Sequence, residues 1–175
     1  MNRIISEAFF EMTKKKNIDK ITVKDLVDVC GISRQTFYYH FQDIIDVIEW
    51  TSKQAFDEAL EKSLQAESPD VAIHHFVSMA IQHRDLTYQL LHSQKREYVE
   101  KMFQQGFQTY LRELISNRPA NISLPKADID MAICFYSYGI TGILLQYCSQ
   151  KNPDADKISQ QMAELLHATL SEINI

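Results

Sequence analysis

A seven-residue stretch, RQTFYYH (34–40), carries many of the side chains in this 175-residue sequence that are suited to recognising another molecule. Arg34 and Gln35 have forked sets of hydrogen-bonding groups, which match the major-groove edges of guanine and adenine respectively. Tyr38 and Tyr39 lie four residues further along, so a helix here would place polar aromatic groups beside them. These residue types favour recognition of nucleic acid.

Signals around this stretch predict short helices joined by a tight turn. Thr22, followed three residues later by Asp25, is typical of a capping box at the start of a helix. Gly31 suits the left-handed residue that ends that helix, and Ser33 can cap the next one. An earlier helix is predicted over residues 2–16, with three lysines closing its last turn. This order is typical of a helix-turn-helix unit.

The spacing of Phe37 and Phe41 predicts which face of the 34–40 helix is buried. They lie four residues apart and can pack against Ile21, Leu26 and the first helix. An aromatic-rich helix buried in a core is the alternative. The flanking turn and cap residues favour an exposed helix that enters the major groove.

The stretch ITVKDLVDVCGISRQTFYYHFQD resembles the N-terminal domain of the TetR family of bacterial regulators, over residues 1 to about 47. The shared pattern is a Thr-led helix, a Gly turn, a Ser cap and then Thr-apolar-Tyr-x-His-Phe. The resemblance implies an all-α protein, with a helix-turn-helix DNA-binding domain at 1–47 and a helical effector-sensing and dimerisation domain at 48–175. It implies DNA contacts from Thr22, Lys24, Ser33, Arg34, Gln35, Thr36, Tyr38, Tyr39 and His40.

Within that set, Arg34 and Gln35 are the predicted base-edge contacts. The residues better placed for phosphates are Thr22, Lys24, Thr36, Tyr38, Tyr39 and His40, although Tyr38 can also reach a base. Family members often carry Lys just after the His-Phe pair, where this sequence has Gln42 and Ile44. We therefore expect weaker and less salt-dependent nonspecific binding. The net charge of −5 divides into +2 for residues 1–41 (seven Lys/Arg, five Asp/Glu) and −7 for residues 42–175 (eleven and eighteen).

The rest of the sequence predicts helices only. Asp43 can cap a helix to about residue 65, and Ser68-Pro69-Asp70 is typical of the next helix start. Further helices are predicted at about 70–82, 84–93, 95–116, 127–150 and 154–173, with a loop at NRPANISLPK. This gives about nine helices and no convincing strand.

Aromatic residues on these helices are the candidates for an effector pocket, and plain core packing is the alternative. The predicted lining is Trp50, Phe76, Tyr88, Phe103, Phe107 and Tyr110. The effector is left open between a small molecule and a partner protein. Four histidines (74, 75, 83 and 92) lack acidic partners at metal-site spacing, so we predict no metal site.

The uncharged run MAICFYSYGITGILLQYC (131–148) is long enough for a membrane span, but its polar residues favour a buried helix or a dimer interface. Gly139 and Gly142 would allow close helix approach, and the next helix has apolar residues at matching spacing. The predicted homodimer interface comprises Gly139, Gly142, Leu145, Met162, Leu165, Leu166 and Thr169. Such a dimer would read a palindromic operator in double-stranded DNA.

The predicted function is effector-controlled transcription regulation, with repression favoured and activation left open. RQTFYYHFQD and IIDVIEW are also similar to the TetR-like subset related to activators of dihydroxyacetone kinase operons. A TetR-fold interaction protein that no longer binds DNA is the alternative. We found no nucleophile elbow, phosphate loop or HExxH motif, so we predict no enzyme and no cofactor. Three scattered cysteines and the lack of a secretory signal favour the cytoplasm.

Overall fold

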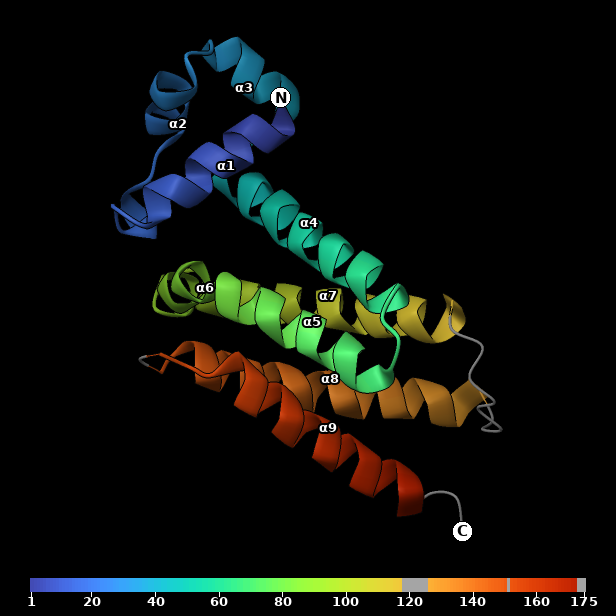
Figure 1. The fold of residues 1–175 in the computed structure, drawn as a ribbon. Coiled ribbons are helices and arrows are strands. Elements are labelled where there is room, and N and C mark those ends of the chain that lie inside the picture. Colours follow the sequence, from blue (N-terminus) through green and yellow to red (C-terminus); the bar gives the residue numbers. More distant parts are fainter. Residues whose placement is uncertain (118–125, 151, 173–175) are drawn as a thin grey trace.

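The computed structural model describes residues 1–117, 126–150 and 152–172. These residues form nine α-helices and one short 3-10 helix, with no strand among them, which confirms the predicted all-α class. The helices are α1 (Asn2–Thr13), η1 (Ile18–Lys20), α2 (Val23–Cys30), α3 (Arg34–His40), α4 (Ile44–Leu64), α5 (Pro69–Gln82), α6 (Arg84–Leu91), α7 (Arg96–Asn117), α8 (Lys126–Cys148) and α9 (Ala155–Glu172). The first helices form one end of the molecule, and α4 leads from them into the helical body (Figure 1).

The turn between α2 and α3 has the predicted local structure. Thr22 Oγ1 accepts from the Asp25 amide (3.2 Å), and Asp25 Oδ2 accepts from the Thr22 amide (2.8 Å), which closes the capping box. Gly31 ends α2 with φ +64°, a conformation that costs glycine little. Ser33 Oγ accepts from the Thr36 amide (3.0 Å) and so caps α3.

The end of α1 differs from the sequence prediction. The helix was predicted to run to residue 16, but it ends at Thr13, before the lysine run. Asn17 caps η1 by accepting from the Asp19 amide (2.9 Å), and η1 buries Ile18 in the core. Lys16 then forms an ion pair with Asp25 (2.7 Å) instead of lying in the last turn of α1. Burial of Ile18 and pairing of Lys16 therefore outweigh continuation of the helix.

Two hydrophobic cores hold the molecule together. The first contains Phe9, Leu26 and Phe37 from the N-terminal helices, together with Leu90 and Val99 from α6 and α7. Helices of the body therefore contribute to the core that supports the turn between α2 and α3. The end of the molecule that contains α2 and α3 is not packed independently of the body.

The second core lies within the body and joins α4, α5, α7, α8 and α9. α9 lies along α5, α5 and α7 lie against α4, and α8 lies against α7 (Figure 1). Ser68 caps α5 with Pro69 in its first turn, as predicted, by accepting from the Val71 amide (3.3 Å). The predicted NRPANISLPK loop lies outside the described residues, apart from Asn117 and Lys126, which belong to helices.

Candidate nucleic-acid interface

α3 packs its inner face, which includes Phe37, against the core and leaves its outer face exposed. Phe37 is completely buried and lies edge-on to Tyr38, with ring centroids 5.5 Å apart. Arg34 and Gln35 are exposed, and 57% of Tyr38 and 85% of Tyr39 is accessible to solvent. Exposure of two large aromatic rings on so short a helix is unusual unless another molecule covers them.

The predicted phosphate contacts surround this face. Lys24 is exposed on α2, and half-buried His40 stands edge-on to Tyr39 with centroids 5.0 Å apart. The hydroxyls of Ser33 and Thr36 lie 2.9 Å apart and share a hydrogen bond. The Thr22 hydroxyl donates to Asp25 Oδ2 (2.8 Å), so it must leave that carboxylate before it can donate to a phosphate.

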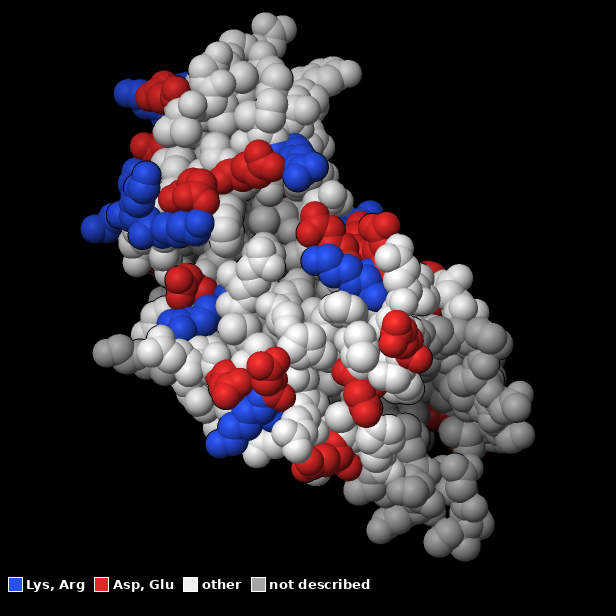
Figure 2. Space-filling model, in the orientation of Figure 1, with Lys and Arg blue, Asp and Glu red and all other residues white. Residues whose placement is uncertain are grey.

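Asp25 brings a stable negative charge close to these groups. Its pKa is lowered from 3.8 to about 2, chiefly by the hydrogen bond from Lys16 and then by those from Thr22. Lys and Arg gather where α1 ends, while acidic side chains are spread over the body (Figure 2). In the same view, little charge is seen at the α3 end. Specific contacts must therefore come largely from uncharged groups and Arg34.

Three backbone amides at the start of α4 are already hydrogen-bonded to carboxylates. Asp43 Oδ1 accepts from the amides of Ile45 (2.7 Å) and Asp46 (3.1 Å). Asp46 Oδ2 accepts from the Gln42 amide at 2.8 Å. Helix N-termini commonly bind phosphates through such amides. Here two carboxylates occupy them, at the point where the sequence also lacks the expected lysine.

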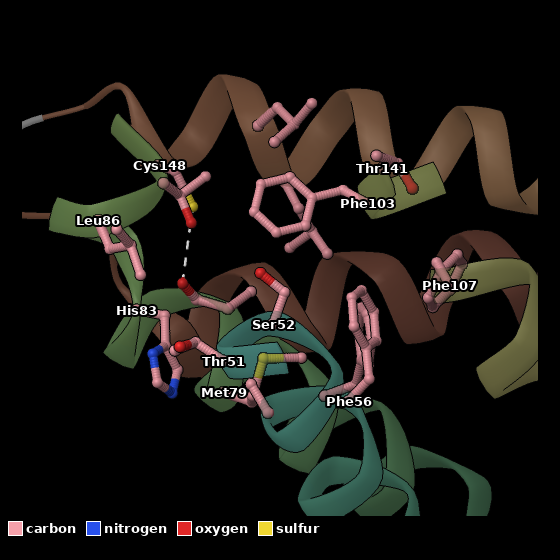
Figure 3. A pocket seen from close by; sticks show the side chains of 16 residues that line it. Thr51, Ser52, Phe56, Met79, His83, Leu86, Phe103, Phe107, Thr141 and Cys148 are labelled. Atoms are coloured by element: carbon pink, nitrogen blue, oxygen red, sulfur yellow. Dashed lines mark hydrogen bonds between the residues drawn. The ribbon is translucent and has the colours of Figure 1, made fainter. Parts of the chain in front are cut away.

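A cavity of about 60 Å³ lies in the body among α4, α5, α6, α7 and α8 (Figure 3). Three predicted pocket residues line it, namely Phe76, Phe103 and Phe107. The structure does not bring the other three to this cavity. Trp50 lies against Phe41 in the first core (6.4 Å between centroids).

The two remaining predicted pocket residues are both tyrosines with other surroundings. Tyr88 is exposed, and its ring lies tilted against that of His92, with centroids 4.1 Å apart. Tyr110 is buried in the second core, where its hydroxyl donates to Ser63 Oγ (2.8 Å). Tyr110 lines a separate surface groove between α4 and α7.

The sequence analysis overlooked the polar residues of this cavity. Thr51, Ser52, His83, Thr87 and Cys148 all line it. Burial lowers the pKa of His83, and burial raises the pKa of the Cys148 thiol to about 11. The available signal was a set of small hydroxyl residues on otherwise apolar helix faces. Within the described residues, no cluster of His, Cys, Asp and Glu could hold a metal ion.

The outer face of α8 is a third exposed feature. Met131, Phe135 and Tyr138 are 73%, 71% and 62% exposed. A Cβ added at Gly139 or Gly142 would meet no atom within 4 Å, so both glycines face open space. By length and composition alone α8 could also cross a membrane, and 22% of its apolar window is buried.

The other predicted interface residues have different surroundings. Leu165 is exposed on α9, while Leu145 and Leu166 are half-buried. Met162 is 5% exposed and belongs to the second core, so it is not available on the surface of the chain. The Thr169 side chain lies outside the described residues.

Comparison with known proteins identifies the body of the chain. Residues 67–171 match the family model of a TetR-type "Transcriptional regulator C-terminal region". The HTH-type dhaKLM operon transcriptional activator DhaS of Lactococcus lactis subsp. lactis (strain IL1403) is 31% identical over 58 residues. That match covers 33% of this chain and 31% of the relative.

Two solved structures share the fold over most of their length. The dihydroxyacetone kinase operon activator DhaS superposes with a TM-score of 0.74 at 18% identity, covering 97% of this chain and 96% of that one. The TetR family repressor AlkX from Dietzia sp. strain DQ12-45-1b gives 0.59 at 12% identity, covering 98% and 95%. The predicted helix-turn-helix regulator fold is confirmed, and the chain belongs to the TetR family of transcriptional regulators.

Proposed function

We propose that this regulator binds a palindromic operator as a homodimer, and that a ligand or partner at its helical body changes its affinity for DNA. The exposed outer face of α3 carries the proposal. Arg34 and Gln35 lie at the N-terminal end of that helix, where a helix in the major groove reaches the base edges. Tyr38 and Tyr39 extend the same exposed surface.

Phosphate contacts are assigned to the residues around that face. Ser33, Thr36 and His40 flank α3, and Thr22 and Lys24 begin α2. The carboxylates of Asp43 and Asp46, which hold the amides at the start of α4, reduce the number of phosphate contacts. Compared with a protein that has lysine at position 42, we therefore expect the specificity of this protein to depend more on base contacts and its affinity for DNA to depend less on salt.

Dimerisation through α8 accounts for the apolar face that one chain leaves exposed. Met131, Phe135 and Tyr138 would be covered by the α8–α9 surface of a second copy, with Gly139 and Gly142 at the closest approach. The apolar length of α8 then serves a subunit interface rather than a membrane span. With α8 in a subunit interface, we expect the protein to be found with its DNA in the cytoplasm.

Control by the body is assigned to α6, because that helix contacts both the cavity and the N-terminal helices. His83 and Thr87 line the cavity, while Leu90 belongs to the first core. The Gln89 side chain accepts from the Ile18 amide (3.0 Å) and donates to the Thr13 carbonyl. A displacement of α6 would therefore move the end of α1 and, with it, α2 and α3.

A second connection joins the cavity to α1 directly. Thr51 lines the cavity, and its hydroxyl donates to the Val47 carbonyl (2.6 Å). Because its one hydrogen is used there, Ser6 must donate in the 2.8 Å bond between the two hydroxyls. Phe10 of α1 also contacts His83, with centroids 5.3 Å apart.

The test is selection of bound sites from a random duplex library. Wild-type protein should enrich a palindrome with half-sites about 34–36 Å apart. Arg34→Ala should weaken binding by about 1–3 kcal/mol at one base pair of each half-site, and Thr36→Ala should weaken all sequences alike. Arg96→Ala, which removes an exposed arginine whose ion pair with Glu100 lies within α7, is the matched control. Lack of enrichment from folded dimeric protein would contradict the proposal.

A TetR-fold protein that no longer binds DNA is the second candidate. The occupied amides at the start of α4 and the −7 charge of residues 42–175, from eleven Lys/Arg and eighteen Asp/Glu, favour it. Retention on heparin separates the two functions. Protein that binds heparin at low salt and elutes as the salt concentration is raised supports DNA binding. Protein that does not bind heparin at low salt supports an interaction role.

A further inference from the structure

The residues that line the cavity in the body disfavour a charged ligand. Its lining contains aromatic, aliphatic and small residues, and Phe56, Phe76, Phe103 and Phe107 supply most of the rings. Apart from His83, no lining residue is ionisable near neutral pH. Burial lowers the pKa of His83, so its ring is neutral at pH 7. A charged ligand would lose its hydration here, and the nearby charges of Arg84 and Glu58, which act on Cys148 and His83, do not line the cavity.

The size of the cavity limits the ligand. A volume of about 60 Å³ gives room for on the order of four to six water-sized groups. Pockets for drug-sized molecules are larger, at about 300–1,000 Å³. The cavity therefore fits a molecule with a short carbon skeleton without rearrangement of the five helices around it.

Two polar side chains of the wall, those of Thr51 and Cys148, are already hydrogen-bonded. Thr51 is bonded to Val47 and Ser6, and Cys148 Sγ donates to the Ala80 carbonyl at 3.6 Å. Figure 3 marks this thiol contact with a dashed line. The Ser52 oxygen is directed into the cavity in the same view. Ser52 is thus placed to bind one polar group of a ligand.

We propose that this cavity binds a small, uncharged, mainly apolar molecule of about five heavy atoms, whose single hydroxyl or carbonyl group is held by Ser52. The proposal rests on the effector control assigned above, and it specifies the chemistry of the effector. Polyols are excluded because an apolar wall cannot replace the hydrogen bonds that several hydroxyls make with water.

Methyl NMR of full-length protein labelled at methionine tests binding directly. Met79 lines the cavity, whereas Met131 lies exposed on α8 and is an internal control. The probes are 1-butanol, glycerol and butyrate, which have similar sizes but differ in polarity and charge. We expect 1-butanol to shift the Met79 signal saturably at millimolar concentrations, with Met131 unchanged. Equal shifts from glycerol or butyrate, or no saturable shift from 1-butanol, would overturn the proposal.

The hydroxyl contact has its own test. Ser52→Ala should weaken 1-butanol binding by about 2- to 12-fold, the effect of one hydrogen bond, and leave cyclopentane binding unchanged. Ser78→Ala, which removes a hydroxyl bonded to His74 outside the cavity, is the matched control. Unchanged 1-butanol binding in Ser52→Ala would remove Ser52 from the proposal.

Occupancy of the cavity is tested by filling it. Ala55→Leu adds volume at the wall and should abolish the Met79 shift. A Met79 shift retained in folded Ala55→Leu would place 1-butanol elsewhere and refute the site. If this variant does not fold, the Ser52→Ala comparison decides.

Failure of this inference is distinguishable from failure of the proposed function because binding is measured without DNA. Protein that selects a palindrome but does not bind 1-butanol would be a regulator with a different effector. Protein that binds 1-butanol but selects no sequence would retain the cavity and lose the operator.

Discussion

Gln89 provides the sharpest test of communication between the body and the DNA-binding helices. Its amide bridges two backbone groups at the junction of α1 and η1, the Ile18 amide and the Thr13 carbonyl. Gln89→Leu keeps a side chain of similar volume but removes both hydrogen bonds. Because the two backbone groups lie in a partly buried junction, the expected loss is about 1–3 kcal/mol.

Hydrogen exchange measures this loss at the affected atom. The Ile18 amide should exchange about 5- to 150-fold faster in Gln89→Leu than in wild type, which is the same free energy expressed as an opening constant. Amides in α9 should be unaffected. The affinity for the selected operator should also change if α6 transmits control.

The matched control is Gln82→Leu, at an exposed glutamine at the end of α5. It makes the same chemical change away from the junction. Unchanged exchange at Ile18 in Gln89→Leu, or an equal acceleration in Gln82→Leu, would refute the coupling through this side chain.

Three further predictions follow from the interface, the capping box and the start of α4. Gly139→Leu should leave the monomer folded, because no atom lies near an added Cβ, but should disrupt the dimer; an unchanged sedimentation profile would exclude this part of α8 from the interface. Gln42→Lys should steepen the salt dependence of DNA binding by about 0.9 in log–log slope, whereas Gln65→Lys at the other end of α4 should not; equal slopes in the two variants would contradict the phosphate argument. The pKa of Asp25 is lowered to about 2, so its stabilising contribution is present above pH 3.8 and is lost as the pH falls toward 2. Measured by urea unfolding, the decrease in the free energy of unfolding at acidic pH should be smaller in Lys16→Met than in wild type, and unchanged in Lys15→Met. The same reduction in both variants would exclude the Lys16–Asp25 pair as the cause.

The elements that were predicted well depend on interactions within a few residues of sequence. Thr22 and Asp25 bond to each other's backbone, Ser33 bonds three residues ahead, and Asp43 bonds two and three residues ahead. Side-chain chemistry and spacing define such caps almost completely. Gly31 belongs to the same class because its positive φ is a local requirement.

The features that escaped prediction depend on distant residues. α1 ends at Thr13 because Ile18 and Lys16 find partners elsewhere, and Gln89 reaches the same junction from 71 residues away. Gly106 has a similar explanation: a Cβ there would lie 2.6 Å from the Phe56 ring on α4. No local pattern around residue 106 indicates that close approach.

The predicted pocket residues depend partly on local sequence and partly on contacts between distant helices. The sequence analysis proposed both Phe76 and Phe107 for the pocket, and in the structure their rings lie 4.5 Å apart. It could not place Trp50 in the other core or leave Tyr88 exposed, because both outcomes depend on how α4 and α6 are rotated against the N-terminal helices. Small residues such as Ser52 line the cavity but were not among the predicted pocket residues.

The apolar run in α8 illustrates why composition alone left three interpretations open. One stripe, which includes Ile133, Ile140 and Leu144, is buried in the chain. The other stripe includes Met131, Phe135 and Tyr138 and is exposed over most of its area. A helix with one apolar stripe in a core and a second one facing water needs a partner along the second. The position of the glycines on that open side favours another helix as the partner, since close backbone approach is what they permit.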